Sequence, residues 1–416
     1  KSCVAKPRGT ERVAPRTGTV GLRRLLPDTT RAPVRREAAA PAPWSANRLL
    51  PTIVRLLDHP RLENGEESLS HSAFSLWDVV DDVIRAMGPM AAKSGVDLCY
   101  LPRDDCPDIF TGDPNKLRQI LLHLVSNAVK FTERGEIVIR SRIDSSDNRE
   151  SVLRLSVADT GIGFPSSLSE QVFEPFFQAD DSASRQHSGI GLGLTIAKGL
   201  AELMGGTVGA QSKAGKGSTF WFTAALTNAD STTVSEFAVS RCRDGDISRD
   251  PEKLLAIRGF KLLIANASNL VRKSLMKMTA DWNCIVEEAP GAEKALSLLR
   301  VAASMNEPFH AVLLDVRLPD SGIREVVAAV RDVQHTRSTT LIGFVPMGSA
   351  GADFRTESSP FPTLLDKPAT KSDFFRALVD AAAKKAYSPP KTQFFRAADR
   401  LNEPPRVTGA APPPHA

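Results

Sequence analysis

Hydrophobic positions between residues 67 and 226 recur at spacings that predict alternating helices and strands. Helical spacing runs over residues 74–92, and again after Asp113-Pro114, where Asp113 is expected to cap the helix and Pro114 to occupy its first turn. An apolar run over residues 153–157 predicts a buried strand that ends at Asp159. Further strands are expected at residues 96–101, 136–143, 207–211 and 218–226, with a helix from about 192 to 204.

A second alternation covers residues 258–386. The pattern predicts strands at 261–264, 284–287, 311–314 and 341–345 and helices at 270–279, 292–301 and 324–333. Such alternation is typical of a parallel sheet with helices on both faces, in which ligand sites lie at the carboxyl ends of the strands. Asp315 directly follows one of these predicted strands.

The remaining segments carry weaker patterns. Residues 1–66 are interrupted by prolines that break any long helix, among them those at positions 27, 33, 41, 43 and 51. Residues 227–257 are polar and are interpreted as a linker. Residues 387–416 are rich in proline and alanine and are expected to be disordered.

Composition narrows the class of protein. The chain has 416 residues, enough for two or three domains, and 53 Lys+Arg against 48 Asp+Glu. Much of the surplus of +5 lies in the first 60 residues, where a solvated arm is favoured over a contact with nucleic acid or membrane. No apolar run reaches the ~18 residues of a membrane span. We expect no nucleic acid partner and no membrane contact within this chain.

Cysteine usage and the first residue bear on location. Five cysteines, with no pair at metal-ligand spacing, fit reduced thiols and a cytoplasmic location. Because the chain starts at Lys1, we interpret it as a fragment of a longer protein, and any sensor or membrane part would then lie upstream.

Two glycine clusters provide the candidate chemistry. Gly161 and Gly163 follow the strand that ends at Asp159, and a second cluster, residues 189–193, opens a predicted helix. Glycines let backbone approach a ligand closely, and a helix start presents free N–H groups to phosphate. A carboxylate can accept the amine of an adenine. Together these features predict a nucleotide pocket with a lid, although either cluster alone is typical of ordinary turns.

The order and spacing of the motifs resemble those of hybrid sensor histidine kinases of two-component systems. Residues 112–132 (GDPNKLRQILLHLVSNAVKFT) resemble the asparagine box, 157–164 the first glycine box and 173–177 the phenylalanine box. Residues 188–194 resemble the second glycine box, and 215–218 the glycine turn before the last strand. The resemblance implies two α/β units: a two-layer ATP-binding sandwich of the histidine-kinase/gyrase type at 67–226, and a doubly wound, flavodoxin-like receiver domain at 258–386.

The resemblance also implies roles for individual residues. Asn127 would hold Mg²⁺, Lys130 would neutralise phosphate charge, and Arg185 would lie near the terminal phosphate. Asp159 would bind the adenine amine. The other implied cofactor-binding residues are Gly161, Gly163, Phe177, Gly189, Gly191, Leu192, Gly193 and Thr219. The implied cofactors are ATP and Mg²⁺, and the implied chemistry is phosphoryl transfer to a histidine, driven by positioning and charge neutralisation.

Two departures affect the kinase part. His123 replaces a second asparagine of the asparagine box; it is either a weaker Mg²⁺ ligand or a solvated helix residue. Thr10 stands where the phosphoacceptor histidine is expected, so residues 1–66 are interpreted as a degenerate dimerisation segment. The expected partner is therefore a histidine-containing dimerisation domain or phosphotransfer protein acting in trans, within a homodimer or heterodimer.

The receiver-like part departs further. Asp315 matches the phosphoacceptor aspartate and Lys367 the lysine that contacts the phosphoryl group. Ala265 and Asn266 stand in place of the acidic pair that binds Mg²⁺, and Val345 replaces the switch Ser/Thr. These replacements favour a pseudo-receiver.

Three functional interpretations remain open at the level of sequence. The first is an ATP-dependent histidine kinase core in a phosphorelay. The second is a non-catalytic ATP-binding regulatory scaffold. The third, another ATPase of the same fold such as the gyrase branch, is disfavoured because a glutamate base is expected at the position of His123.

Overall fold

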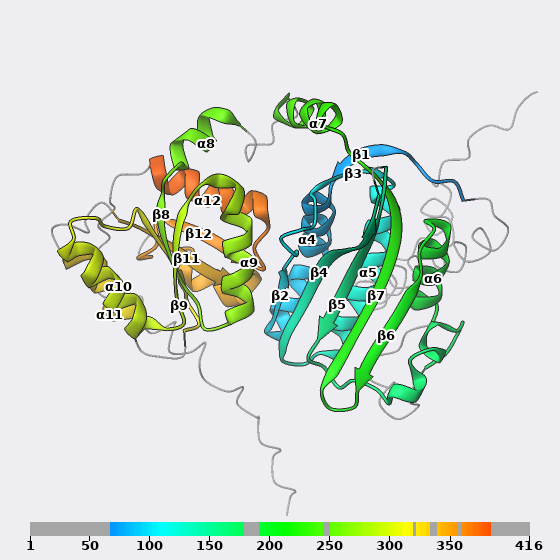
Figure 1. Ribbon diagram of the computed structural model, residues 1–416. Coiled ribbons are helices and arrows are strands. Elements are labelled where there is room, and N and C mark those ends of the chain that lie inside the picture. Colours follow the sequence, from blue (N-terminus) through cyan, green and yellow to red (C-terminus); the bar gives the residue numbers. More distant parts are fainter. Residues whose placement is uncertain are drawn as a thin grey trace, which may run out of the picture. The chain divides into compact units, whose positions relative to one another are not determined.

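The computed structural model describes residues 67–147, 149–178, 191–243, 250–318, 322–332, 339–356 and 359–383. Two α/β domains lie within these residues, and each is described by itself (Figure 1). The proposed dimerisation segment with Thr10, the tail 387–416 and the lid positions Arg185 and Gly189 lie outside the described residues.

The first domain contains a seven-stranded mixed sheet in the order β1-β3-β7-β5-β4-β2, with β6 paired to β7. Its β2 and β4 strands are parallel and the other pairs are antiparallel. The strands are β1 (Ser72–Ser75), β2 (Val96–Tyr100), β3 (Ile109–Gly112), β4 (Gly135–Ser146), β5 (Glu150–Asp159), β6 (Val208–Lys213) and β7 (Gly217–Asn228).

Helices cover one face of this sheet (Figure 1). They are α4 (Leu76–Ser94), α5 (Pro114–Phe131) and α6 (Gly193–Leu203), with the short 3-10 helices η1 (Ser166–Leu168) and η2 (Gln171–Phe173). The burial of β5 alternates strictly, because Leu153, Leu155 and Val157 face the helices while the residues between them are partly exposed. The domain is thus a two-layer sandwich, as expected.

Local signals explain the helix that carries the asparagine box. Asp113 caps α5, and its Oδ1 accepts hydrogen bonds from Asn115 N and Lys116 N at 3.0 Å each. Pro114 occupies the first turn. The residues predicted to form a core face are all buried: Leu117, Ile120, Leu121, Leu124, Val125 and Ala128. The cap and the face of this helix were therefore predicted correctly.

The first expected helix begins two residues later than its apolar spacing predicts. Phe74 is buried, but it belongs to strand β1 rather than to a helix, because Ser75 adopts an extended conformation and caps α4. Strands β1 and β3, which no pattern predicted, pair with each other.

The second domain contains a five-stranded parallel sheet in the order β12-β11-β10-β8-β9. Its strands are β8 (Lys261–Ala265), β9 (Ile285–Ala289), β10 (Ala311–Asp315), β11 (Thr340–Pro346) and β12 (Thr363–Lys367). Its helices are α9 (Asn269–Thr279), α10 (Ala292–Ser304), α11 (Ile323–Asp332) and α12 (Lys371–Ala383), with the 3-10 helices η4 (Ala280–Trp282) and η6 (Gly348–Phe354).

Both faces of this sheet are covered. Every residue of the central strand β10 is buried, and its side chains alternate between two core clusters. Ala311 and Leu313 belong to the cluster that contains α9 and α12, whereas Val312 and Leu314 belong to the cluster of α10 and α11. This is the doubly wound, flavodoxin-like arrangement expected from the alternating pattern.

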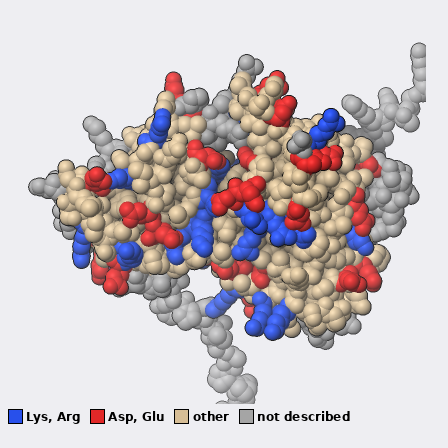
Figure 2. Space-filling model, in the orientation of Figure 1, with Lys and Arg blue, Asp and Glu red and all other residues tan. Residues whose placement is uncertain are grey.

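The segment interpreted as a polar linker is largely helical. It carries α7 (Ser231–Arg243) and α8 (Pro251–Ile257), the latter capped by Asp250. The helices of the described residues are all too short or too polar to cross a lipid bilayer. On the face seen in Figure 2, acidic and basic side chains are interspersed, in keeping with the near balance of 53 basic and 48 acidic residues.

Candidate functional site

Asp159 lies at the end of β5 in a cradle of backbone donors. Its Oδ1 accepts hydrogen bonds from Gly161 N at 2.8 Å and from Ser218 N at 3.2 Å. The residue is only 8% exposed, and burial raises the pKa of its carboxyl group, which the two backbone donors partly offset. Within the described residues, Oδ2 accepts no hydrogen bond. The carboxylate is thus fixed on one side and open to a donor on the other.

The glycine after Asp159 is required by close packing. A Cβ on Gly161 would lie 2.3 Å from the Phe131 carbonyl oxygen, at the end of α5. That same oxygen accepts a hydrogen bond from Ile162 N at 3.2 Å. The first glycine box is therefore packed directly onto the C-terminal end of the asparagine box, which places Asp159 near the end of α5.

Strand register brings Ser218, rather than Thr219, to Asp159. Ser218 pairs directly with Asp159 across β5 and β7, so the two side chains share a face of the sheet. Thr219 pairs with Ala158 and lies on the opposite face. Ser218 was missed as a site residue, although the alternation of buried Phe220 and Phe222 in the same strand carries the signal that identifies its face.

The polar face of α5 carries His123, Asn127 and Lys130, all of them half-buried. Within the described residues, the Asn127 side chain has no hydrogen-bond partner, so its amide oxygen is available to a ligand. Burial lowers the pKa of Lys130, whose ammonium group lies 4.7 Å from the Phe131 ring centroid. A partly desolvated ammonium group of this kind is suited to pairing with phosphate.

The start of α6 lies beside the same face. A Cβ on Gly193, the first residue of α6, would lie 3.4 Å from His123 Nδ1, so the imidazole packs against this helix start. Leu192, which precedes Gly193, is 3% exposed and packs in the core, where it anchors the helix. The free N–H groups and the positive dipole end of α6 are thus close to His123.

The phenylalanine box contacts Gly191, two residues before this helix. Phe176 N donates a hydrogen bond to Gly191 O at 3.2 Å. Gly191 has φ +78, and a Cβ there would lie 2.9 Å from the Phe176 backbone and 3.0 Å from the Phe177 carbonyl oxygen. Phe177 is half-buried, and the part of it that approaches Gly191 is its backbone carbonyl oxygen.

The site residues predicted from sequence are brought together in part. Asp159, Gly161 and the end of α5 meet directly, and His123 meets Gly193. Gly163, with φ +61, approaches the Lys213 carbonyl oxygen across the turn before β7, and its role at the site stays a prediction. Thr219 lies on the other face of the sheet.

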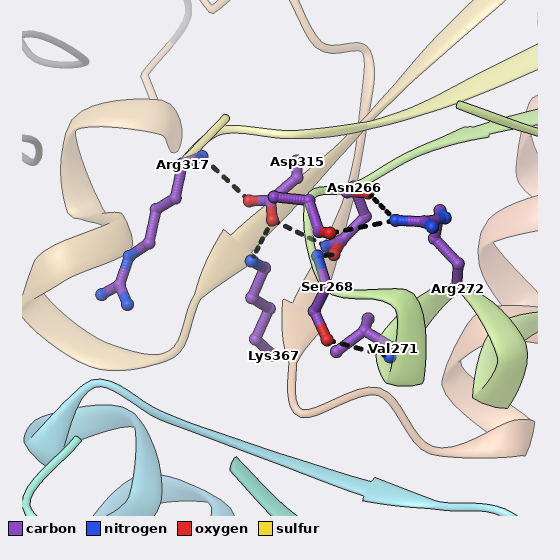
Figure 3. A network of polar contacts seen from close by, with 8 residues as sticks. Asn266, Ser268, Val271, Arg272, Asp315, Arg317 and Lys367 are labelled. Carbon is purple, nitrogen blue, oxygen red and sulfur yellow. Dashed lines mark hydrogen bonds and ion pairs between the residues drawn. The ribbon is translucent and has the colours of Figure 1, made fainter. Parts of the chain in front are cut away.

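A second polar site lies at the carboxyl edge of the parallel sheet (Figure 3). Asp315 ends β10, Lys367 ends β12 and Asn266 follows β8. The Lys367 ammonium lies 2.6 Å from Asp315 Oδ2. The resemblance implied that Lys367 contacts a phosphoryl group on Asp315, and the structure brings the two side chains together. Val345, in place of the switch hydroxyl, is fully buried in β11.

Comparisons with known proteins agree with this geometry. Residues 112–228 match the family described as "Histidine kinase-, DNA gyrase B-, and HSP90-like ATPase". The sensory/regulatory protein RpfC of Xanthomonas campestris pv. campestris is 30% identical over 387 residues, which cover 88% of this chain and 52% of RpfC. The sensor protein GacS of Pseudomonas syringae pv. syringae is 40% identical over 215 residues, which cover 52% of this chain and 24% of GacS.

This chain is related to the hybrid sensor histidine kinases. A crystal structure of full-length ShkA in complex with AMPPNP has the same fold, with a TM-score of 0.61 at 23% identity over 88% of this chain and 69% of ShkA. The resemblance deduced from the motifs is therefore confirmed, together with the fold class and an ATP-binding domain of the histidine-kinase type. The chain spans about half of RpfC and about a quarter of GacS.

The residues of this histidine-kinase-type domain fit a magnesium ion bound together with ATP. Asn127 offers one hard oxygen ligand on the face that also carries Lys130, and the nucleotide's own phosphates would supply others. Within the described residues, no group of three or more His, Cys, Asp and Glu side chains could hold a metal by itself. The ion would therefore depend on the nucleotide, as is usual where phosphates carry Mg²⁺.

Proposed function

We propose that this chain is the ATP-binding core of a hybrid sensor histidine kinase, which transfers the γ-phosphoryl group of ATP to a histidine supplied in trans. The observation that carries the proposal is the Asp159 carboxylate, fixed through Oδ1 by two backbone N–H groups and open through Oδ2. An acceptor oriented in this way selects the amine of adenine. The named relatives are sensor proteins, and that supports a place in phosphorelay signalling.

Each residue of the site has a role in this proposal. Asp159 holds the base, while Asn127 holds Mg²⁺, which neutralises phosphate charge when it is bound. Lys130 adds a second cation, and the start of α6 offers N–H groups to the phosphates. Phosphoryl transfer needs little covalent help from the protein, so this positioning and charge neutralisation would supply most of the catalysis. Arg185 and Gly189 remain proposed lid residues.

The acceptor histidine is proposed to come from another chain or domain. Thr10 stands at the expected position, and a threonine hydroxyl is a weak nucleophile without an activating base. The proposed partner is therefore a histidine-containing dimerisation domain, in a homodimer or heterodimer, or a phosphotransfer protein. A cytoplasmic location belongs to the same proposal.

Nucleotide binding is tested first, by titrating a fluorescent ATP analogue into wild type, Asp159→Asn and Asn127→Ala, with and without Mg²⁺. Both substitutions should weaken binding, and only Asn127→Ala should reduce the effect of Mg²⁺. Asp105→Asn, at an exposed carboxylate paired with Arg103, is the matched control. Equal affinities for all four proteins would refute the proposed site.

Phosphoryl transfer is tested second. Radiolabelled ATP is mixed with this chain and a complete histidine-containing dimerisation domain from a relative. Acid-labile phosphate should form on the added domain, and at ATP concentrations below saturation less of it should form with Asp159→Asn. If nucleotide binds but no phosphate is transferred, the second candidate, an ATP-binding regulatory scaffold, is favoured. The imidazole of His123 beside Gly193, in place of a harder amide ligand, is the observation that supports that candidate.

A further inference from the structure

Asp315 in the receiver-like domain has both carboxylate oxygens engaged by groups of the same domain (Figure 3). Oδ1 accepts a hydrogen bond from Arg317 N at 2.9 Å. Oδ2 accepts from Asn266 Nδ2 at 2.7 Å and from Lys367 Nζ at 2.6 Å. The aspartate is 4% exposed. Its charge is therefore compensated by one ammonium, one amide and one backbone donor.

The orientation of the Asn266 amide is fixed at both ends. Asn266 is 1% exposed, and its Oδ1 accepts a hydrogen bond from Ser268 N at 2.8 Å. A backbone N–H can only donate and an ionised carboxylate can only accept, so the NH₂ group must face Asp315. Turning the amide over would break both bonds and place its oxygen against the carboxylate. Asn266 therefore presents a donor where a cation would need an acceptor.

The donor set at this edge does not fit the magnesium ion that a receiver fold implies. Mg²⁺ requires oxygen ligands in near-octahedral geometry. Ala265 is 1% exposed and offers only a methyl group, and Asn266 presents its NH₂ group. Two backbone oxygens of the same loop, those of Asn266 and Ala267, accept hydrogen bonds from Arg272 Nη1 at 2.7 and 3.0 Å.

Arg272 fixes this loop from the opposite side. Arg272 is only 7% exposed to solvent. Its Nε lies 2.9 Å from Glu288 Oε2 on β9. The guanidinium thus joins the loop after β8 to the neighbouring strand through three hydrogen bonds of fixed geometry. Adding a divalent cation nearby would bring it close to a buried positive group that is already paired.

We propose that the Asn266 amide and the Lys367 ammonium replace the divalent cation of a receiver, so that Asp315 is a structural carboxylate and is not phosphorylated. It follows, if the proposed kinase function holds, that the phosphoryl group passes to an aspartate on a separate receiver domain that keeps its acidic pair. In that step the N–P bond of phosphohistidine breaks, an O–P bond forms on the acceptor carboxylate, and the released imidazole takes up a proton from water.

The test uses the full chain, acetyl phosphate and Mg²⁺, without ATP, so its outcome does not depend on the kinase site. Phosphate on the peptide that contains Asp315 is measured by mass spectrometry. Wild type should show none above a sample without Mg²⁺. The double variant Ala265→Asp/Asn266→Asp restores oxygen ligands and should gain Mg²⁺-dependent phosphate. Asn306→Asp adds one negative charge at an exposed residue of this domain, as the single change Asn266→Asp does at the site, and should behave as wild type.

Two results would overturn the proposal. One is Mg²⁺-dependent phosphate on Asp315 of the wild type, a measurement that requires no variant to fold. The other is a double variant that unfolds cooperatively yet gains neither phosphate nor a rise in melting temperature with Mg²⁺. If the double variant does not fold, the gain of phosphate and of melting temperature with Mg²⁺ is measured on the single variant Asn266→Asp instead. A chain that fails to use ATP but gives the expected result here would refute only the kinase function.

Discussion

Changing Asp159 to Asn should alter which purine the site prefers. In the variant, the amide oxygen must stay toward Gly161 N and Ser218 N, because both are donors at 2.8 and 3.2 Å. The NH₂ group then occupies the place of Oδ2 and faces the adenine amine, so a donor meets a donor. The variant loses one charge-assisted hydrogen bond, a contribution of about 1.5–3 kcal/mol.

That free energy corresponds to about a 10- to 100-fold weaker affinity for ATP, at 1.4 kcal/mol per factor of ten. Inosine triphosphate carries a carbonyl oxygen where adenine carries its amine, so the amide of the variant can donate to it. The ratio of affinities for ATP and inosine triphosphate should therefore fall sharply in Asp159→Asn. Competition against a fluorescent analogue measures both affinities on the same protein.

The purine comparison separates recognition from a general loss of structure. If Asp159→Asn lowers the affinities for ATP and inosine triphosphate by the same factor, the carboxylate does not distinguish the two bases and the reasoning is refuted. Thermal unfolding without nucleotide provides the control, and Asp105→Asn should leave both affinities at their wild-type values.

Three further predictions test how the site is supported. Asp113→Ala removes the cap that accepts two backbone N–H groups of α5 and should lower the free energy of unfolding by about 1–2 kcal/mol in urea, whereas Asp113→Asn should retain most of it. Gly161→Ala should lower the melting temperature more than Gly215→Ala, whose Cβ would meet nothing within 4 Å and which bears only the backbone strain of φ +75; equal losses would contradict the packing argument. Burial lowers the pKa of Lys130, so nucleotide affinity should fall with rising pH earlier than for an exposed lysine, and Lys130→Arg should abolish that fall.

The features predicted from sequence are those that depend on local spacing. The cap at Asp113, the core face of α5 and the strand ending at Asp159 are each determined by neighbours within a few residues, so the pattern of apolar positions was sufficient. The parallel sheet and the place of Asp315 at its edge followed from the alternation, whereas the role of Lys367 followed only from the resemblance to a receiver.

The features missed depend on partners far away in the chain. Strand β1 exists because Ser72 pairs with Gly112, and no local signal marks either short strand. Ser218 was overlooked because its role depends on the face it shares with Asp159, which is set by the register of β5 and β7. The sequence correctly indicated that Asn266 replaces a carboxylate. That its NH₂ group faces Asp315 depends on the hydrogen bond from Ser268 N to its oxygen, and this orientation exists only in the folded loop.

The hydrogen bond between Phe176 N and Gly191 O has a practical consequence for protein engineering. It brings together two backbone positions that are far apart in the sequence. Doubling the length of a flexible loop costs only about 0.6 kcal/mol. An insertion between these two positions should therefore lower the free energy of unfolding of the sandwich only slightly, which urea denaturation of such a variant would measure.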